Sequence, residues 1–397
     1  MIHSYTCKNF FSIREEAEVL FTVNEFAPET FMYKKDAHER VSLLETVIGP
    51  NASGKTNVIK SIAFIKHLIA YSANDDVEKE ILTMPYANND KPTEVSVKFS
   101  LGKRLFEYRF SVTRKRILKE ALREQSLTAA RTTYKTLFSR QWKNGRYEVV
   151  NHVFKISPDM NWRQNASMVS QMLLAQSDSF AAEIVGYWRE NVVTTNVWYG
   201  GNRDDQMQSN DIMTKRAIED LYRNTNLLTS AKEILRSIDV GFDDFEREEL
   251  HIERRVHHRI KHKYARNNFA ISLDFESSGT KRAIVILRDM LRALSAKGGF
   301  AAIDELDAYL HPDIVEALVK LFMSPETNPN RSQLLFTSHS HRLLSEFDKQ
   351  QITLVEKNED GETEVWRLDD MTGVRADDNY YTKYIAGAYG ARPKVTI

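Results

Sequence analysis

Residues 49–56, with the sequence GPNASGKT, match the G-x-x-x-x-G-K-[ST] pattern of a loop that binds phosphate groups. An apolar run typical of a buried strand (41–49) precedes this loop, and apolar residues at helical spacing (58–69) follow it. Gly49 and Gly54 allow the backbone to curl, so that successive N–H groups point at phosphate oxygens. Because the strand and the helix supply the context that the pattern requires, a phosphate site is preferred to a plain glycine-containing turn.

Two side chains of the loop carry its expected chemistry. Lys55 is placed to reach the β- and γ-phosphates of a nucleotide, and Thr56 to put its hydroxyl on Mg²⁺. The helix that follows begins with unpaired N–H groups and the positive end of its dipole, which also attract an anion. The residues expected to bind the nucleotide here are Gly49, Asn51, Ser53, Gly54, Lys55, Thr56 and Asn57.

A short apolar strand ends in two acidic residues within GFAAIDELDAYLHP (299–312). Ligands of open α/β sheets bind at the carboxyl edge of the parallel strands. Asp304 is therefore expected to hold Mg²⁺, directly or through water, and Glu305 to polarise the attacking water or act as general base. The alternative is a solvated strand end before a helix, where acids are favourable in any case. The phosphate loop earlier in the chain favours the catalytic interpretation.

Two further segments follow the phosphate loop in the sequence, one on each side of the acidic strand end. The turn ESSGT (276–280) opens a helix whose apolar residues line one face, and the strand LLFTS (334–338) leads to His339 and His341. Taken alone, the turn is an ordinary helix start, and a histidine at a strand end is an ordinary surface residue. Together with the phosphate loop and the acidic strand end, both segments form an ordered series of motifs.

The series of motifs resembles that of the ATP-binding-cassette ATPases, and within them the soluble branch of SMC, RecN and OLD-type proteins. The details look most similar to the compact ATPases of bacterial anti-phage systems, of the AbiL, RloA and PARIS kind. The segments that carry this resemblance are CKNFFSI, GPNASGKTN, SSGTKR, IDELDAYLHP and the ending YYTKYIAGAYGARP. Both ends of the chain share the resemblance, whereas residues 75–245 share little of it.

The resemblance implies that the nucleotide is ATP, bound with Mg²⁺, and that a second subunit takes part. Ser277, Ser278 and Gly279 correspond to the signature motif, which contacts the γ-phosphate of ATP held by another copy. The signature departs from the transporter type at two positions, because Glu276 stands in place of leucine and Ser278 in place of glycine. Both departures resemble the soluble branch more than transporters.

Three more residues receive roles from the resemblance. His339 corresponds to the switch histidine that contacts the γ-phosphate, with His341 as its rival. Asp307 corresponds to the D-loop, which crosses the dimer interface. Gln176 in MLLAQSDS is the candidate for the Q-loop glutamine that ligates Mg²⁺, and a plain surface glutamine is the alternative.

The predicted fold is α/β: a P-loop ABC-ATPase head with a mixed central sheet, an N-terminal antiparallel β subdomain and a helical insertion lobe. Residues 1–160 are expected to form the N-terminal half of the core, 161–245 the helical lobe and 246–397 the C-terminal half. In the last of these, strands alternate with helices, as parallel sheets require. Residues 114–125 (RKRILKEALREQ) are interpreted as an exposed helix face.

Composition restricts where the protein works. The single cysteine, Cys7, excludes an internal disulfide and fits a reducing cytoplasm. No apolar run has the length needed to span a bilayer, and the first residues lack the apolar core of a signal peptide. A cytoplasmic protein without a membrane partner is therefore expected.

The chain has 55 basic and 55 acidic residues, which argues against a whole surface devoted to nucleic acid. One local exception is HIERRVHHRIKHKYAR (251–266), which could bind nucleic-acid phosphates or an acidic partner. The alternative is a solvated hairpin. A metal site is not expected there, because neither cysteine nor aspartate accompanies the histidines.

The leading hypothesis is an ATP-hydrolysing molecular switch. Two copies would close head to head on ATP, as a dimer or within a larger homo-oligomer, and control a separately encoded effector, such as a nuclease, in anti-phage defence. The alternative is a DNA-maintenance or repair ATPase of the RecN or SMC-head type that binds DNA directly, although the sequence lacks the long coiled coil of those proteins. A third hypothesis, a scaffold that binds ATP without turnover, is opposed by the set Lys55, Asp304, Glu305 and His339.

Overall fold

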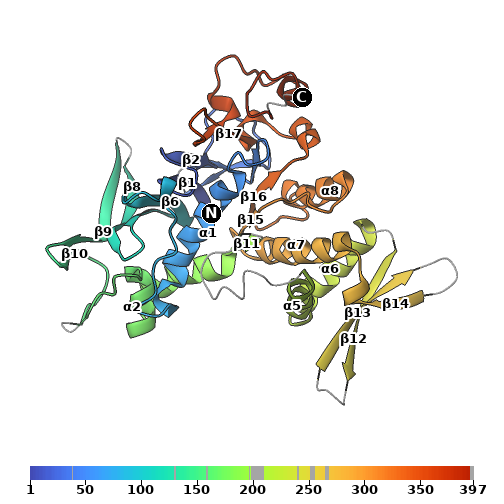
Figure 1. Ribbon diagram of the computed structural model, residues 1–397, viewed down its shortest axis with the longest axis horizontal. Helices are drawn as coiled ribbons and strands as arrows, with labels where there is room; N and C mark the ends of the chain where they lie inside the picture. Colours follow the sequence, from blue (N-terminus) through green and yellow to red (C-terminus); the bar gives the residue numbers. More distant parts are fainter. Residues whose placement is uncertain are drawn as a thin grey trace.

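Two large sheets enclose the helix that follows the phosphate loop. The computed structural model describes residues 1–37, 39–128, 131–157, 160–195, 197, 210–238, 241–250, 255–263 and 268–393. Helix α1 (Lys55–Ala70) lies between a seven-stranded and a six-stranded sheet, and its apolar residues share one buried cluster with both (Figure 1). Helices α7 (Ser278–Ser295) and α8 (Pro312–Met323) cover the other face of the six-stranded sheet.

The six-stranded sheet is mixed, as the sequence predicts. Five strands are parallel, and the last one, at the edge, is antiparallel to its neighbour. In spatial order the strands are β11 (Val192–Thr195), β15 (Phe300–Ile303), β16 (Gln333–Ser338), β5 (Leu44–Ile48), β17 (Ile352–Lys357) and β18 (Thr363–Arg367). The central strands are buried on both faces, which explains why apolar residues are frequent in them without alternating along the strand. Their carboxyl ends therefore share one edge, where the phosphate loop, the acidic pair and His339 begin.

The seven-stranded sheet is antiparallel throughout and holds the predicted N-terminal β subdomain. Its strands, in spatial order, are β10 (Arg146–Asn151), β9 (Arg131–Lys143), β8 (Ile117–Thr128), β7 (Arg104–Val112), β6 (Thr93–Leu101), β1 (Ile2–Lys8) and β2 (Ala17–Leu20). The helix expected over 114–125 is wrong, because most of that segment forms β8. Glu120, on the buried face of β8, pairs with the buried Arg140 at 2.7 Å. Because a charged residue stands on the buried face, the sequence of β8 does not show the alternation of polar and apolar residues that indicates a strand.

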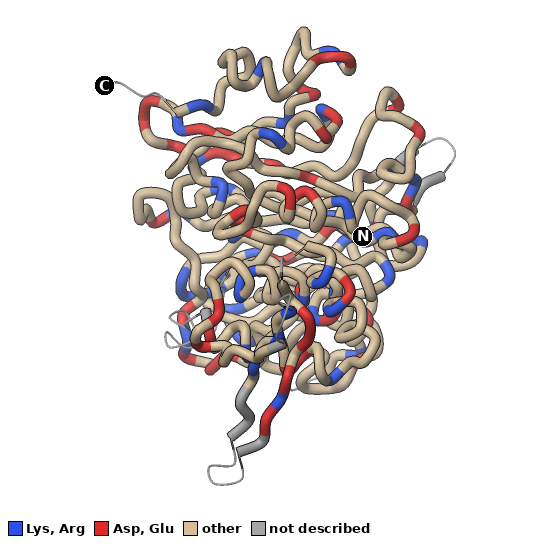
Figure 2. The backbone as a smooth tube through the Cα atoms, turned by 90° about the vertical axis from the view of Figure 1, so that its right-hand side faces the viewer, with Lys and Arg blue, Asp and Glu red and all other residues tan. Residues whose placement is uncertain are grey.

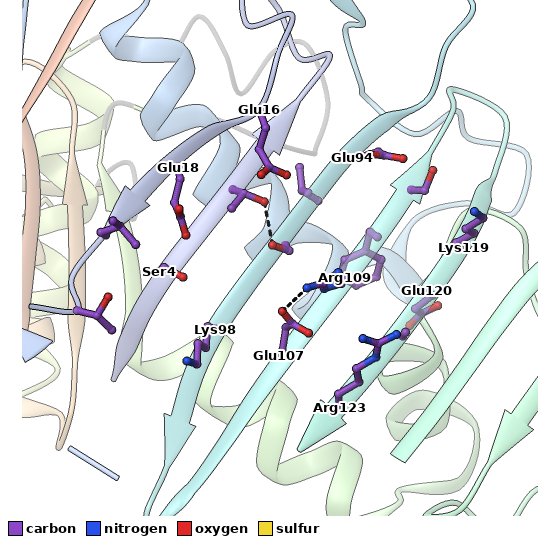
Figure 3. Close-up of a pocket in the computed structure, with 18 of the residues that line it drawn as sticks. Ser4, Glu16, Glu18, Glu94, Lys98, Glu107, Arg109, Lys119, Glu120 and Arg123 are labelled. Atoms are coloured by element: carbon purple, nitrogen blue, oxygen red, sulfur yellow. Dashed lines mark hydrogen bonds and ion pairs between the residues drawn. The ribbon is translucent and has the colours of Figure 1, made fainter. Parts of the chain in front are cut away.

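The face of this sheet that points away from α1 is polar and hollowed (Figure 3). The hollow has a volume of about 760 Å³, and the hydroxyls of Thr6 and Ser96 are hydrogen-bonded at 2.8 Å on its floor. Arg109 and Glu107 form an ion pair at 2.6 Å beside them. None of the residues expected to bind nucleotide lines this hollow.

The helical elements between residues 161 and 245 lie near β11, which is the edge strand of the six-stranded sheet opposite β18 (Figure 1). Residues 192–195 fall within the expected helical lobe (161–245), yet they form strand β11 of the main sheet. Helices α5 and α6 pack against α7, next to a three-stranded antiparallel sheet that projects from the body (Figure 1). The elements are α2 (Met168–Gln176), α3 (Ser179–Gly186), the π-helix η3 (Tyr187–Asn191), α5 (Asn210–Tyr222), α6 (Thr225–Ile238), β12 (Phe242–Leu250), β13 (Arg255–Lys263) and β14 (Asn268–Ser272).

The remaining elements are short. Strands β3 (Tyr33–Asp36) and β4 (Glu39–Ser42) form a small hairpin, and α9 (Tyr380–Ile385) closes the C-terminal segment. The 3-10 helices are η1 (Ser72–Asn74), η2 (Tyr86–Asn88), η4 (Leu273–Phe275), η5 (His341–Ser345), η6 (Lys349–Gln351) and η7 (Leu368–Asp370). Within the described residues, no helix combines the length and the apolar character required to cross a bilayer.

Candidate nucleotide-binding site

The phosphate loop connects β5 to α1 and is tightly packed from behind. Gly54 precedes α1 with a φ of +112°, a conformation that glycine adopts without strain. A Cβ at this position would lie 2.2 Å from Thr363 Oγ1, and a Cβ at Gly49 would lie 2.1 Å from the carbonyl oxygen of Val355. Both glycines are therefore required by contacts with β17 and β18 as well as by the curvature of the loop.

Lys55 points back into the loop. Its Nζ donates hydrogen bonds to the carbonyl oxygens of Gly49 and Pro50, at 2.8 and 2.9 Å. Burial lowers the pKa of the Lys55 ammonium, and the nearby carboxylates, Asp304 first among them, oppose part of that shift. The hydroxyl of Ser53 is also buried and has no hydrogen-bond partner in the described part of the chain. A buried ammonium and a buried, unpartnered hydroxyl in the loop that precedes a helix fit a phosphate group.

Three polar side chains brace the loop, and two of them were not predicted from the sequence. Asn57, expected to bind the nucleotide, donates from Nδ2 to Ser12 Oγ at 2.7 Å. Ser12 Oγ is in turn hydrogen-bonded to Thr363 Oγ1 at 2.7 Å, and Thr363 Oγ1 donates to the Ser53 carbonyl at 2.8 Å. Residues 12 and 363 stand at opposite ends of the chain, so only the folded structure brings them together.

One threonine positions the acidic pair at the end of β15. Thr337 Oγ1 donates to Asp304 Oδ1 at 2.6 Å and accepts the backbone N–H of Glu305 at 2.7 Å. Asp304 is buried, whereas Glu305 is exposed in a left-handed backbone conformation with φ of 52°. This conformation is uncommon for residues other than glycine and suggests that the direction of the Glu305 side chain is functionally constrained. Thr337 was missed, although it stands two residues before His339.

Arg282 of α7 connects the signature helix to the acidic pair. Its Nη2 donates to the carbonyl oxygens of Asp304 and Glu305, at 3.0 and 2.9 Å. Burial lowers the pKa of the guanidinium, while the carboxylates of Glu305 and Asp304 raise it. The sequence offers one signal for this role, since Arg282 comes two residues after the signature turn.

The two histidines after β16 differ in their surroundings. His339 is exposed, and its backbone N–H donates to Asp307 Oδ2 at 2.9 Å, which joins the expected switch and D-loop residues within one chain. The His341 ring lies 4.8 Å from the Tyr384 ring, centroid to centroid. Burial, followed by the charge of His339, lowers the pKa of His341. His341 therefore belongs to the packing of the C-terminal segment, and His339 is the residue that faces the site.

Several of the predicted residues line one cavity of about 430 Å³ beside the loop. Thr56 and the buried Asp304 are the residues that would hold Mg²⁺, whose charge would offset that of the phosphates when bound. Glu305 is the carboxylate that reaches into the cavity, where it can accept a proton from water. The lining consists of Asn51, Ala52, Gly54, Lys55, Thr56, Asn57, Glu305 and His339.

Gln176 does not join this cavity, which corrects its assignment as a ligand of Mg²⁺. Gln176 is exposed at the last residue of α2, and the start of α2 packs beyond the far end of α1. There, Ser170 Oγ accepts the N–H of Ala73 at 3.1 Å, and the N–H of Ser167 donates to Ser72 Oγ at 2.9 Å. A helix as long as α1, with 16 residues, spans about 24 Å, which separates this region from the phosphate loop.

The strand beside β15 is β11, and its carboxyl end lies at the edge that carries the site. Asp304 donates its backbone N–H to the carbonyl of Thr195, the last residue of β11, at 3.2 Å. The carboxyl end of β11 therefore lies directly beside the acidic pair. Sequence reasoning missed it because Val192–Thr195 is too short to separate from the helices around it.

The signature turn lies outside the cavity that contains Lys55. Ser277 caps α7, accepting the N–H of Thr280 on Oγ at 3.1 Å, and both Ser277 and Ser278 are exposed. A Cβ at Gly279 would lie 2.9 Å from the carbonyl oxygen of Tyr309. The surface beside the turn is apolar, because the side chains of Phe275 and Tyr309 are 85% and 73% exposed.

The basic stretch 251–266 is only partly within the described residues, which omit 251–254 and 264–267. Figure 2 colours the acidic positions along β12, the strand that pairs with β13. Three cations of β13 form ion pairs with these acids. The ion pairs are Arg259–Glu248 at 3.6 Å, Lys261–Glu246 at 3.2 Å and Lys263–Asp243 at 3.3 Å. Neutralised in this way, the described part of the strand offers little net positive charge to nucleic acid.

The loop, the acidic strand end and the sheet edge together define a P-loop nucleotide-binding protein of the AAA ATPase type. Residues 46–345 match the family described as "AAA domain, putative AbiEii toxin, Type IV TA system", and the chain belongs to this family. The predicted P-loop α/β fold is thereby confirmed. No curated protein matches the sequence.

Solved structures of similar arrangement include three SMC heads. An SMC head bound to the C-terminal winged-helix domain of ScpA is 16% identical, with a TM-score of 0.45 over 93% of this chain and 99% of that one. The SMC head of Thermotoga maritima is 14% identical, with a TM-score of 0.41 over 92% and 98%. A Pyrococcus furiosus SMC head with an extended coiled coil, bound to the C-terminal domain of ScpA, is 14% identical, with a TM-score of 0.42 over 93% and 97%.

Proposed function

We propose that this protein is an ATP-hydrolysing switch that works as a head-to-head dimer, alone or within a larger homo-oligomer. The observation that carries the proposal is the division of the site. Lys55, Thr56, Glu305 and His339 share one cavity, whereas Ser277 is exposed outside it. ATP on the phosphate loop of one copy would be completed by Ser277 and Gly279 of a second copy.

Each residue then has a role. Lys55 and the loop amides bind the phosphates, and Glu305 takes a proton from the attacking water. His339 contacts the γ-phosphate, and Asp307, which holds the His339 backbone at 2.9 Å, links this contact to the interface. The exposed Phe275 and Tyr309 lie where apolar contact with a second copy would bury them.

The biological setting is also part of the proposal. The family description names a putative AbiEii toxin, and the motifs resemble those of compact anti-phage ATPases. We infer that closing and opening of the dimer hold and release a separately encoded effector during infection. The ion-paired cations of β13 give no support to direct DNA binding, which the alternative of a DNA-maintenance ATPase requires.

The Glu305→Gln variant tests the switch. We expect ATP to convert it to a stable dimer, seen by light scattering, while phosphate release falls roughly 100-fold or more because the general base is gone. The exposed Glu326→Gln variant, on the loop after α8, is the matched control and should behave as the wild type. Normal hydrolysis by Glu305→Gln would refute the role of Glu305. Phosphate release stimulated by duplex DNA would favour the DNA-maintenance function instead.

A further inference from the structure

The projecting three-stranded sheet meets the signature turn at one hydrogen-bonded pair. His262 of β13 and Glu276, the first residue of the turn, are joined from Nε2 to Oε2 at 2.7 Å. Their side chains are only 7% and 6% exposed. A carboxylate at this depth is costly unless it is hydrogen-bonded, so the pair fixes the place of Glu276.

The second carboxylate oxygen continues the connection into the helix. Glu276 Oε1 accepts the backbone N–H of Ser277 at 2.9 Å, and Ser277 Oγ accepts the N–H of Thr280 at 3.1 Å. One chain of hydrogen bonds therefore runs from β13 to the first turn of α7. On the other side of the turn, Lys281 Nζ donates to the carbonyl oxygen of Asp274 at 3.2 Å.

This arrangement does more than a helix cap requires. Ser277 alone supplies the side-chain cap of α7. Glu276 instead ties the backbone of Ser277 to a strand that projects from the body of the molecule (Figure 1). A displacement of the sheet would therefore shift Ser277, whose side chain is exposed on the surface where a second copy would bind.

We propose that His262 and Glu276 are positioning residues for the signature turn. Through this pair, the β12–β14 sheet controls whether the signature turn can complete the ATP site of a neighbouring copy. The inference rests on the proposed head-to-head dimer and adds a control element to it. A partner protein that moves the sheet would thereby change the rate of ATP hydrolysis without touching the nucleotide.

Mixing two inactive variants tests this proposal. Lys55→Ala lacks ATP binding but keeps its signature, and Glu276→Ala keeps its phosphate loop but loses the pair. We expect each alone to retain roughly a tenth or less of wild-type phosphate release, and an equal mixture to recover about a quarter, because half of the random dimers then hold one intact site. Glu276→Ala alone should bind ATP with an affinity within about twofold of the wild type, because its phosphate loop is untouched.

A second pair of variants separates positioning from loss of folding. In His262→Gln the amide N–H can still reach Glu276, so phosphate release should stay within about threefold of the wild type, whereas His262→Ala should match Glu276→Ala. Equal activity of His262→Gln and His262→Ala, at either level, would overturn the proposal. Wild-type hydrolysis by Glu276→Ala would overturn it as well.

The mixture of Ser277→Arg with Lys55→Ala distinguishes this inference from the proposed function. If the mixture with Ser277→Arg recovers activity and the mixture with Glu276→Ala does not, the head-to-head dimer is supported and the proposed role of Glu276 is refuted. If neither mixture recovers and ATP does not dimerise the wild type, the head-to-head dimer itself is refuted.

Discussion

The phosphate loop and the signature turn are built in opposite ways. The loop is braced by Ser12, Thr363 and the strands β17 and β18, and its Lys55 lines a cavity of the same molecule. The turn is held from behind by Glu276, and its serines face outward. One chain therefore holds a phosphate loop that is braced from within and, outside that cavity, an exposed turn that can contact another molecule.

The largest effect is expected on the phosphate side. Lys55→Ala should weaken ATP binding by about 100-fold, because it removes a buried, charge-assisted donor. Ser277→Arg should leave binding to the monomer unchanged, which sharpens the contrast between the two regions. Titration with a fluorescent ATP analogue measures both, and Lys60→Ala, one turn further along α1, is the matched control. Equal loss of binding in Lys55→Ala and Ser277→Arg would abolish the distinction.

A smaller effect is expected from the residue that orients the acidic pair. Thr337→Val keeps the shape of the side chain but removes the hydroxyl that bonds to Asp304 and to the N–H of Glu305. We expect kcat for ATP hydrolysis to fall about tenfold with little change in ATP affinity. Thr337→Ser, which retains the hydroxyl, should restore most of the rate. A loss confined to affinity would place Thr337 in binding rather than in catalysis.

The smallest effect concerns pH. The protonated form of Lys55 binds phosphate, so affinity is full below the pKa of Lys55 in the free protein and falls as pH rises through it. Because burial lowers that pKa, the decline should begin at a lower pH than for a solvated lysine. Calorimetric titration with ATP from neutral to alkaline pH checks this. An affinity that stays constant up to the pH at which ordinary lysines lose their proton would contradict the burial of Lys55.

Much of the fold could be predicted from local patterns. The buried strand before the phosphate loop, the helix after it, and the alternation of strands and helices after residue 280 follow from runs and periods of apolar residues. Segment 114–125 could not, because Glu120 looks like a solvent-facing acid until Arg140 is known to lie opposite it in the core. The assignment of Gln176 as a ligand of Mg²⁺ was wrong for a related reason. Nothing in the segment MLLAQSDS indicates which end of α1 the helix α2 will contact.

The expected chemistry of the site can be read from short segments of the sequence. Glycines, a lysine and a threonine at fixed spacing suit phosphate and Mg²⁺, and paired acids at a strand end suit Mg²⁺ and water, because these are local properties of the chain. Which distant groups support these residues depends on the tertiary structure. The supporting contacts are hydrogen bonds between different segments of the chain. They join Ser12 to Thr363 behind the loop, Thr337 to Asp304 at the acidic pair, and His262 to Glu276 at the signature turn. Such contacts leave no local pattern, since either partner alone is an ordinary polar residue.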